Sequence, residues 1–197
     1  MKKIFLAALI GLAAASCNQA QNQNTAQNTG QTQQQLQTYK NGTYNFEFQY
    51  PADLTFVTPI YASLEDKIVQ VQIPQSAYPK TNFGDAAFSV SAQYAANLQD
   101  CLKLNAPENA DKFSTKVTIN GIDFYMSQGT GAGAGNYYES RVYRALSSGH
   151  MCVELNETLH TSNIYNYPPN TVTEVDKNAV WARLNQILNT FKFTASQ

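Results

Sequence analysis

The sequence predicts an α+β domain, in which an antiparallel sheet of about six to seven strands is covered by a C-terminal helix and a shorter helix. Several short segments alternate apolar and polar residues, which is the period of a half-buried strand. An Asn-Gly pair between two such segments is typical of a tight hairpin. Near the C-terminus apolar residues recur at helical spacing, and this stripe needs a sheet face to cover it.

The strands are predicted in chain order from these alternations. Aromatic residues at every second position predict the first strand over 44–50, which Pro51 ends. Later alternations and a helical segment that carries Cys101 predict three further strands and a short helix. These lie at 54–58, 68–73 and 88–94 for the strands and at 97–104 for the helix.

Two hairpins follow. Asn120-Gly121 suits a type I′ turn, which places Ile119 opposite Ile122. The second hairpin, over 137–160, turns at Ser148-Gly149, and pairing Ser147 with His150 sets Val142 against Leu155. In this register one polar face holds the residues of a candidate binding face, in which Arg141 and Glu154 form a diagonal ion pair. That face comprises Tyr137, Glu139, Arg141, Tyr143, Glu154, Asn156 and His160. The alternative is a solvated or helix-covered sheet face without a binding role.

The last element is a helix. Its apolar stripe comprises Val180, Trp181, Leu184, Ile187, Leu188 and Phe191. Thr173, with Asp176 three residues later, predicts a capping box at its start.

The N-terminus has the layout of an export signal. Lys2 and Lys3 precede an apolar run over 4–15, which is about 18 Å long as a helix and too short for a hydrocarbon core of about 30 Å. The following Ala14-Ala15-Ser16-Cys17 resembles the bacterial lipobox. This resemblance implies cleavage before Cys17 and attachment of lipid to its sulfur. The alternative is an ordinary secretory signal with a structural Cys17.

Composition divides the chain into three segments. Residues 1–16 are predicted to be the lipoprotein signal peptide, and 17–38 to be the lipidated Cys17 followed by a disordered tether rich in Gln, Asn and Thr. A prion-like segment is the alternative for the tether. Residues 39–197 are enough for one globular domain. By resemblance, Asn18 after the lipidated cysteine favours the outer membrane over the inner membrane, with the domain facing the periplasm or the exterior.

The charge balance argues against nucleic acid as a partner. Removing Lys2 and Lys3 from 13 basic residues leaves 11 against 14 acidic ones, a net charge of −3. No basic run follows the signal. The predicted partners are therefore the membrane, through the lipid, and an envelope protein.

The chain has three cysteines, and if Cys17 carries lipid, the other two can pair with each other. Cys101 and Cys152 are then predicted to form a disulfide in an oxidising compartment. The alternatives are two separate thiols or a catalytic thiol. His150 and Cys152 share a strand face, but His150 and His160 lie about 33 Å apart along a strand, so neither a metal nor a cofactor is predicted.

The residues of the Gly-rich segment 129–134 match GxGxxG/A, a loose sequence pattern of dinucleotide-binding loops. Strand-like residues follow it where that pattern needs a helix, which argues against nucleotide binding. It is interpreted as a mobile hairpin tip, with a ligand-covering flap as the alternative.

The two ends of the domain resemble those of PsbP-like domains. The segment Tyr44–Leu54 is similar to their aromatic-x-aromatic-x-Tyr-Pro opening, and the terminal helix running into 189–193 is similar to their closing helix and Ser/Thr-Phe tail. The resemblance implies an antiparallel sheet sandwiched by helices. It also implies a role in binding or assembly without catalysis.

The combined prediction is a membrane-anchored envelope lipoprotein that binds a partner and is not an enzyme, since no catalytic motif is found. One alternative is an envelope hydrolase with the Gly-rich segment as a flap over Arg141 and Glu154. Another is a small-ligand carrier with a cavity between the sheet and the Trp181 helix.

Overall fold

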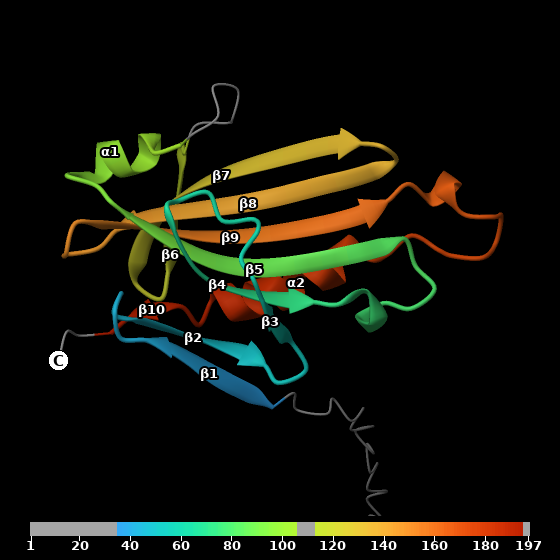
Figure 1. Ribbon diagram of the computed structural model, residues 1–197, viewed down its shortest axis with the longest axis horizontal. Coiled ribbons are helices and arrows are strands. Elements are labelled where there is room, and N and C mark those ends of the chain that lie inside the picture. The colour runs from blue at the N-terminus through green and yellow to red at the C-terminus, as the bar shows by residue number, and fades with distance from the viewer. Residues whose placement is uncertain (1–34, 106–112, 195–197) are drawn as a thin grey trace, which may run out of the picture. The chain divides into compact units, whose positions relative to one another are not determined.

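The structure is a computed structural model that describes residues 35–105 and 113–194 (Figure 1). The chain divides into two units, Met1–Thr32 and Gln33–Gln197, and every described residue belongs to the second. The predicted signal, Cys17 and most of the predicted tether thus lie outside the described residues. The predicted boundary at residue 39 falls too late, because strand β1 already begins at Leu36. Among the described helices, none is long and apolar enough to cross a membrane.

A seven-stranded antiparallel sheet forms the centre of the domain and confirms the predicted α+β class (Figure 1). Its strand order is β3-β4-β5-β9-β8-β7-β6. The strands are β3 Thr55–Val57, β4 Asp66–Ile73, β5 Phe83–Tyr94, β6 Thr115–Ile119, β7 Ile122–Gly133, β8 Asn136–Leu146 and β9 Met151–Ser162.

A second sheet of three strands was not predicted. Its order is β1-β2-β10, with β1 Leu36–Asn41, β2 Phe46–Pro51 and β10 Lys192–Phe193. The predicted opening strand is β2, which therefore belongs to this sheet and not to the large one. β1 is mostly exposed and polar and β10 has two residues, so neither carries the alternating pattern that reveals a strand.

The two faces of the large sheet are covered differently. We call the face that carries Phe88 and Leu155 the inner face, and the face that carries Ser89 and Asn156 the outer face; neighbouring residues of a strand point to opposite faces. Helix α2, Lys177–Leu188, lies behind the sheet in Figure 1, and the loop between β3 and β4 lies in front of it. The short helix α1, Leu98–Lys103, contacts β8. Single 3-10 turns occur at Gln75–Ala77 and Ile164–Asn166.

The main core lies between the inner face, α2 and β2. The Phe48 ring meets Phe88 of β5 edge-on at 5.2 Å between centroids, and Phe46 stacks on Phe191 at 5.5 Å. All four rings are at most 1% exposed. Burying a side chain of this size stabilises the fold by roughly 1.5–3 kcal/mol, so these contacts attach the small sheet firmly to the large one.

Helix α2 has the predicted apolar stripe but a different cap. Val180, Trp181, Leu184 and the two later stripe positions are buried as expected, and Phe191 is buried just beyond the helix end. The N-cap is Asp176, whose carboxylate accepts from the backbone N–H of residue 178 at 2.9 Å. The predicted cap at Thr173 is wrong, because Thr173 instead bridges to Thr81 beside β5.

The first hairpin has the predicted register. Ile119 pairs with Ile122 and Val117 with Phe124. Asn120 and Gly121 both have positive φ, at 49° and 78°, as a type I′ turn requires.

The second hairpin is shifted by one residue from the predicted register. Val142 pairs with Asn156, and Tyr143 takes the place opposite Leu155. The backbone N–H of Ser147 donates to Met151 O at 2.9 Å, so the loop holds three residues, and its last residue, His150, has a φ of 58°. The sequence suggested a two-residue turn at Ser148-Gly149. The extra left-handed residue changes which side chains of β8 and β9 share a face.

Candidate functional site

The register shift splits the predicted binding face between the two sides of the sheet. Its four β8 residues, 137, 139, 141 and 143, share the inner face with Leu155. Its three β9 residues, Glu154, Asn156 and His160, lie on the outer face. The prediction that all seven form one face is therefore wrong, and so is the predicted pairing of Arg141 with Glu154.

The β8 residues on the inner face are engaged by the core and by α2. The Arg141 guanidinium lies over the Trp181 ring, 4.0 Å from its centroid. Glu139 pairs with Lys177 of α2. Tyr143 is 5% exposed and donates its hydroxyl to Glu157 Oε2 at 3.1 Å. These side chains hold the helix against the sheet, which is the helix-covered alternative named above.

Glu154 pairs with Arg144 instead. Arg144 is 2% exposed and Glu154 is fully buried, and Arg144 Nε donates to Glu154 Oε2 at 2.9 Å. Arg144 also donates to the carbonyl of Cys101, and Ser63 donates its backbone N–H to Glu154 Oε1. A buried pair is stable only when its remaining donors and acceptors are satisfied, as they are here. The network ties the β3–β4 loop and α1 to the outer face.

The predicted disulfide is confirmed. Cys101 of α1 and Cys152 of β9 are bonded, with Cα atoms 5.2 Å apart. Both cysteines are fully buried and pack with Leu64 of the β3–β4 loop. The disulfide pins α1 onto the outer face beside the Arg144–Glu154 pair.

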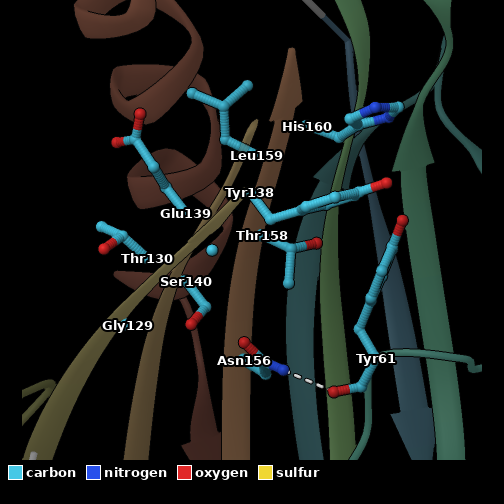
Figure 2. Close-up of a pocket in the computed structure, with 11 residues that line it drawn as sticks. Tyr61, Gly129, Thr130, Tyr138, Glu139, Ser140, Asn156, Thr158, Leu159 and His160 are labelled. Atoms are coloured by element: carbon cyan, nitrogen blue, oxygen red, sulfur yellow. Dashed lines mark hydrogen bonds between the residues drawn. The ribbon is translucent and has the colours of Figure 1, made fainter. Parts of the chain in front are cut away.

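A pocket of about 420 Å³ opens on the rest of the outer face (Figure 2). It lies between the β3–β4 loop and strands β7, β8 and β9. The lining residues are Tyr61, Gly129, Thr130, Gly131, Tyr138, Glu139, Ser140, Asn156, Thr158, Leu159 and His160. Three residues of the predicted face, Glu139, Asn156 and His160, thus line one pocket. Tyr61, Tyr138 and Thr158 join them there although they belong to no predicted site.

One wall of the pocket consists of the rings of Tyr138, His160 and Tyr61, which are connected by stacking and by hydrogen bonds to Asp85. The Tyr138 ring stacks on His160, with centroids 4.7 Å apart. His160 Nδ1 lies 3.1 Å from Asp85 Oδ2, and its Nε2 lies 2.9 Å from Asn136 Oδ1. The other Asp85 oxygen accepts from the Tyr61 hydroxyl at 3.2 Å. Polar partners on both ring nitrogens fix the His160 ring, so Tyr138 is held as a rigid aromatic surface.

The Tyr61 hydroxyl stays protonated in this arrangement. Burial, together with the nearby charge of Asp85, raises the pKa of Tyr61 to about 12. A protonated phenol donates to the carboxylate and does not serve as a base at neutral pH. The Tyr61 hydroxyl therefore suits recognition better than proton transfer.

Two pocket-lining residues carry a polar side-chain atom that has no hydrogen-bond partner among the described residues. Asn156 donates its Nδ2 to Tyr61 O at 2.5 Å, but its buried Oδ1 has no hydrogen-bond partner among the described residues. The buried Oγ1 of Thr158 has none there either. Leaving such an atom unsatisfied costs about 1–3 kcal/mol. Both atoms are buried beneath the lining, so a bound group reaches them only if the lining side chains move.

The lining carries no free charge. The side chains of Glu139 and Leu159 point away from the pocket toward the helix in Figure 2, where the Glu139 carboxylate pairs with Lys177. Lysine and arginine are absent from the lining residues. The chemistry of the site is therefore that of an aromatic surface with neutral acceptors and hydroxyls.

Residues 129–133 of the Gly-rich segment belong to strand β7, and Ala134 begins the turn that joins β7 to β8, so the segment forms one arm and part of the tip of a hairpin. Gly129 pairs with Ser140, Gly131 with Tyr138 and Gly133 with Asn136. These three alternate positions place the glycines on the outer face, beside the pocket. A strand, β8, follows the segment, as the sequence predicted.

Neither histidine belongs to a cluster of metal-ligand type. Within 35–105 and 113–194, His, Cys, Asp and Glu form no group of three or more that could hold a metal ion. His150 lies at the β8–β9 turn, where its Nδ1 is 3.0 Å from Ala96 O.

The sequence contained a signal for part of what was missed. Arg144 stands between the apolar Val142 and Leu146 on one face of β8, and a charge between two apolar neighbours indicates a buried ion pair. No comparable local signal identifies Tyr61, because its loop reaches the outer face only through the tertiary fold. Tyr138 and Thr158 become neighbours only in the correct hairpin register.

No protein-family model and no curated protein matches the chain. Solved structures similar to it include a protein from Bacteroides thetaiotaomicron, at TM-score 0.44 and 18% identity over 80% of this chain, which spans 48% of that protein. They also include cyanobacterial PsbP from Synechocystis, at TM-score 0.44 and 14% identity, covering 83% of this chain and 95% of PsbP. LpqN of Mycobacterium tuberculosis, involved in cell envelope biogenesis, is similar at TM-score 0.45 and 14% identity, covering 83% of this chain and 92% of LpqN. At these identities the likeness concerns the fold alone.

Proposed function

We propose that this protein is a lipid-anchored protein of the bacterial cell envelope whose domain binds an uncharged ligand group in the outer-face pocket without catalysis. The signal layout and Cys17 support the anchor and the location. The observation that carries the binding function is the pocket itself, whose lining combines the stacked Tyr138 ring with the polar side chains of Asn156 and Thr158.

The chemistry of the lining defines the ligand. Asn156 Oδ1 needs a hydrogen-bond donor, and the Thr158 hydroxyl can accept or donate. Tyr138 offers an aromatic surface on which a flat apolar group packs well. An anionic ligand finds no lysine or arginine in the lining, and both oxygens of Asp85 already have partners. The ligand group is therefore neutral, carries N–H or O–H donors and has an apolar face, as a sugar ring does.

Residues 129–133, proposed as a flap in the hydrolase alternative, form part of strand β7 and pair with β8. The ion pair proposed in that alternative is absent, since Arg141 and Glu154 lie on opposite faces. The small-ligand carrier alternative keeps a specific observation in its favour, the pocket volume of about 420 Å³, which is within the usual range for small-molecule sites. Its predicted location beside Trp181 is replaced by the outer face.

Replacing Thr158 with Val tests the binding function. The Thr158→Val change keeps the shape and removes a hydroxyl that has no protein partner, so we expect the free energy of unfolding to change by less than about 1 kcal/mol. Binding of N-acetylglucosamine, a neutral probe with amide and hydroxyl donors, should weaken about tenfold. NMR titration of the full-length protein in detergent measures both the affinity and the shifts of Tyr138 and Asn156.

Thr115→Val, on β6 outside the pocket lining, is the matched control and should bind the probe as the wild type does. Co-sedimentation with purified cell-wall sacculi separates the two sources of such a group. Binding to sacculi and to the monosaccharide indicates a wall-bound partner, whereas binding to the monosaccharide alone indicates a carrier. If no neutral sugar shifts the pocket signals, or if Thr158→Val lowers stability by several kcal/mol, the pocket is structural and the proposal is wrong.

A further inference from the structure

Strand β7 has an open edge. Strand β6 pairs only with residues 122–126 of β7, and in the part of the chain that the structure describes no strand pairs with that side of β7 beyond Met126. Residues 128–133 are all exposed. The Gly-rich half of β7 is therefore joined to the sheet on one side, by β8, and faces outward on the other.

The hairpin geometry shows which backbone groups lie on this edge. Two-residue turns join Ile119 to Ile122 and Gly133 to Asn136, and the residues that close such turns are hydrogen-bonded to each other. Since the pattern alternates along an antiparallel strand, odd-numbered residues from 125 to 133 bond to β8. Gln128, Thr130 and Ala132 therefore present their N–H and C=O groups outward, away from β8.

This edge lacks the features that usually prevent strand pairing. Proteins protect exposed edges with charged side chains, proline, a bulge or a very short strand. Residues 127–133 contain neither charge nor proline, and the β7–β8 register runs without a shift. The other two edges of the large sheet are shorter, since β3 has three residues and β6 has five, including Lys116.

We propose that the open edge of β7 binds an extended peptide segment of a partner protein, which adds to the large sheet as a further strand. Main-chain hydrogen bonds to Gln128, Thr130 and Ala132 provide the affinity of this mode of recognition, and side-chain pockets provide its specificity. The proposal goes beyond the ligand function proposed above and does not depend on it.

The glycines of β7 leave space for side chains of such a peptide. Alternate side chains of an added strand project over the outer face, next to the row formed by Gly129, Gly131 and Gly133. A Cβ atom placed on Gly133 meets no atom within 4 Å, and one on Gly131 meets only the Tyr138 Cβ at 4.0 Å. A large side chain of the peptide can thus lie across β7 toward Tyr138 and the mouth of the pocket.

A second copy of this chain fits the edge less well. Two β7 edges paired about a twofold axis through Thr130 place the glycines of one copy opposite those of the other on the outer face. Cross-strand side-chain pairs are the unit that stabilises and registers a sheet, and this arrangement has none on that face. A peptide of different sequence can supply those side chains, which is why the proposal commits to one.

A proline at Thr130 provides the test. The Thr130 N–H points away from β8, so Thr130→Pro removes an edge donor without removing a ladder hydrogen bond. Random heptapeptides displayed on phage are selected against the full-length protein in detergent, and the affinity of the selected peptides is measured by fluorescence anisotropy. We expect Thr130→Pro to weaken peptide binding at least about tenfold and Thr130→Ser to leave it within about twofold.

Amide hydrogen exchange on the wild type gives a readout that needs no variant. Bound peptide should slow exchange at Gln128, Thr130 and Ala132, while Gly129 and Gly131 are already protected by β8. Selection of no peptide, equal binding by Thr130→Pro, or protection elsewhere would overturn the proposal. The proposal would also be overturned if sedimentation showed a dimer that Thr130→Pro dissociates and that the selected peptides leave intact, because the edge would then bind a second copy of the chain. The Thr158→Val variant should bind the selected peptides as the wild type does. A failure of the peptide-binding proposal can therefore be told apart from a failure of the ligand-binding proposal.

Discussion

At the scale of single residues, Glu157 is the most unusual ionisable group of the inner face. It is fully buried between Phe88 and Arg141 in the strand register, and its Oε1 has no hydrogen-bond partner among the described residues. Burial raises the pKa of Glu157 to about 7, although the Tyr143 hydroxyl and the Arg141 charge act in the opposite direction. The folded protein therefore holds a proton on this carboxyl in a range where the unfolded chain has lost it.

This shift makes stability fall as pH rises. Between the ordinary pKa of 4.5 and about 7 the folded state binds more protons than the unfolded state, so the free energy of unfolding decreases with pH across that window. The shift corresponds to about 3 kcal/mol, present in full below the window and lost above it. Glu157→Gln should remove this dependence and be more stable than the wild type at about pH 8. Urea unfolding at several pH values measures it; equal pH profiles for the two proteins would contradict it.

Arginine placement shows what single residues reveal before a fold is known. Arg141 and Arg144 differ by three positions, so they point to opposite faces of β8. The sequence analysis paired Arg141 with Glu154, whereas Arg144 forms that pair at 2.8 Å and Arg141 packs on Trp181. Composition does not distinguish the two arginines. The distinction depends on the hairpin register, which a single residue at the turn controls.

At the scale of elements, the disulfide determines whether α1 stays on the outer face. Helix α1 has six residues, which is too short to be stable alone, and its only fully buried side chain is Cys101. Two of its carbonyls, those of Cys101 and the adjoining Leu104, accept from Arg144. Cross-linking across a sequence separation of 51 residues therefore also keeps the acceptors of a buried guanidinium in place.

Removing the disulfide should destabilise the domain by about 4 kcal/mol, on the loop-entropy model for this separation. The variant carries both Cys101→Ala and Cys152→Ala, and its unfolding midpoint in urea is compared with that of the wild type. Dithiothreitol should lower the wild-type midpoint and leave that of the double variant unchanged. A wild type that responds to the reductant no more than the double variant would show that the cross-link contributes nothing.

The two hairpins show why some elements are predictable. Asn120-Gly121 lies between two alternating runs, and Asn and Gly both accept positive φ, so turn chemistry and apolar pattern select the same register. At the β8–β9 turn the residue with positive φ is His150. Histidine is not a residue type from which a left-handed turn position is predicted. The apolar pattern there also tolerates both registers, because β9 is buried on both faces over most of its length.

At the scale of the whole molecule, the class of fold follows from pattern but the second sheet does not. Alternation and the apolar stripe of α2 suffice for an antiparallel sheet with a helix on one face. The separation of β2 from the large sheet depends on aromatic packing, such as Phe48 against Phe88, between segments far apart in the chain. The pocket cannot be predicted from the sequence either, since the β3–β4 loop forms its wall through long-range contacts such as the hydrogen bond from Asn156 to Tyr61.

The proposed membrane anchor belongs to the scale of the whole chain. Cys17→Ala removes the sulfur that the proposed lipid modifies, so the variant should leave the membrane fraction and appear in soluble extracts. Fractionation followed by immunodetection measures this, and intact-mass analysis of the wild type should find a chain that begins at Cys17 with added acyl mass. Retention of Cys17→Ala in the membrane, or an uncut precursor in the cytosol, would contradict the anchor.

Gly84 has a consequence for how this protein changes over generations. A methyl group at that position would lie 2.4 Å from His160 Nδ1, so any other amino acid there displaces the imidazole and, with it, the stacked Tyr138 ring. Descendant sequences that retain the pocket should therefore keep glycine at this site even where the flanking surface drifts freely. Lineages that have substituted it should have lost the aromatic wall as well, and the two losses should be inherited together.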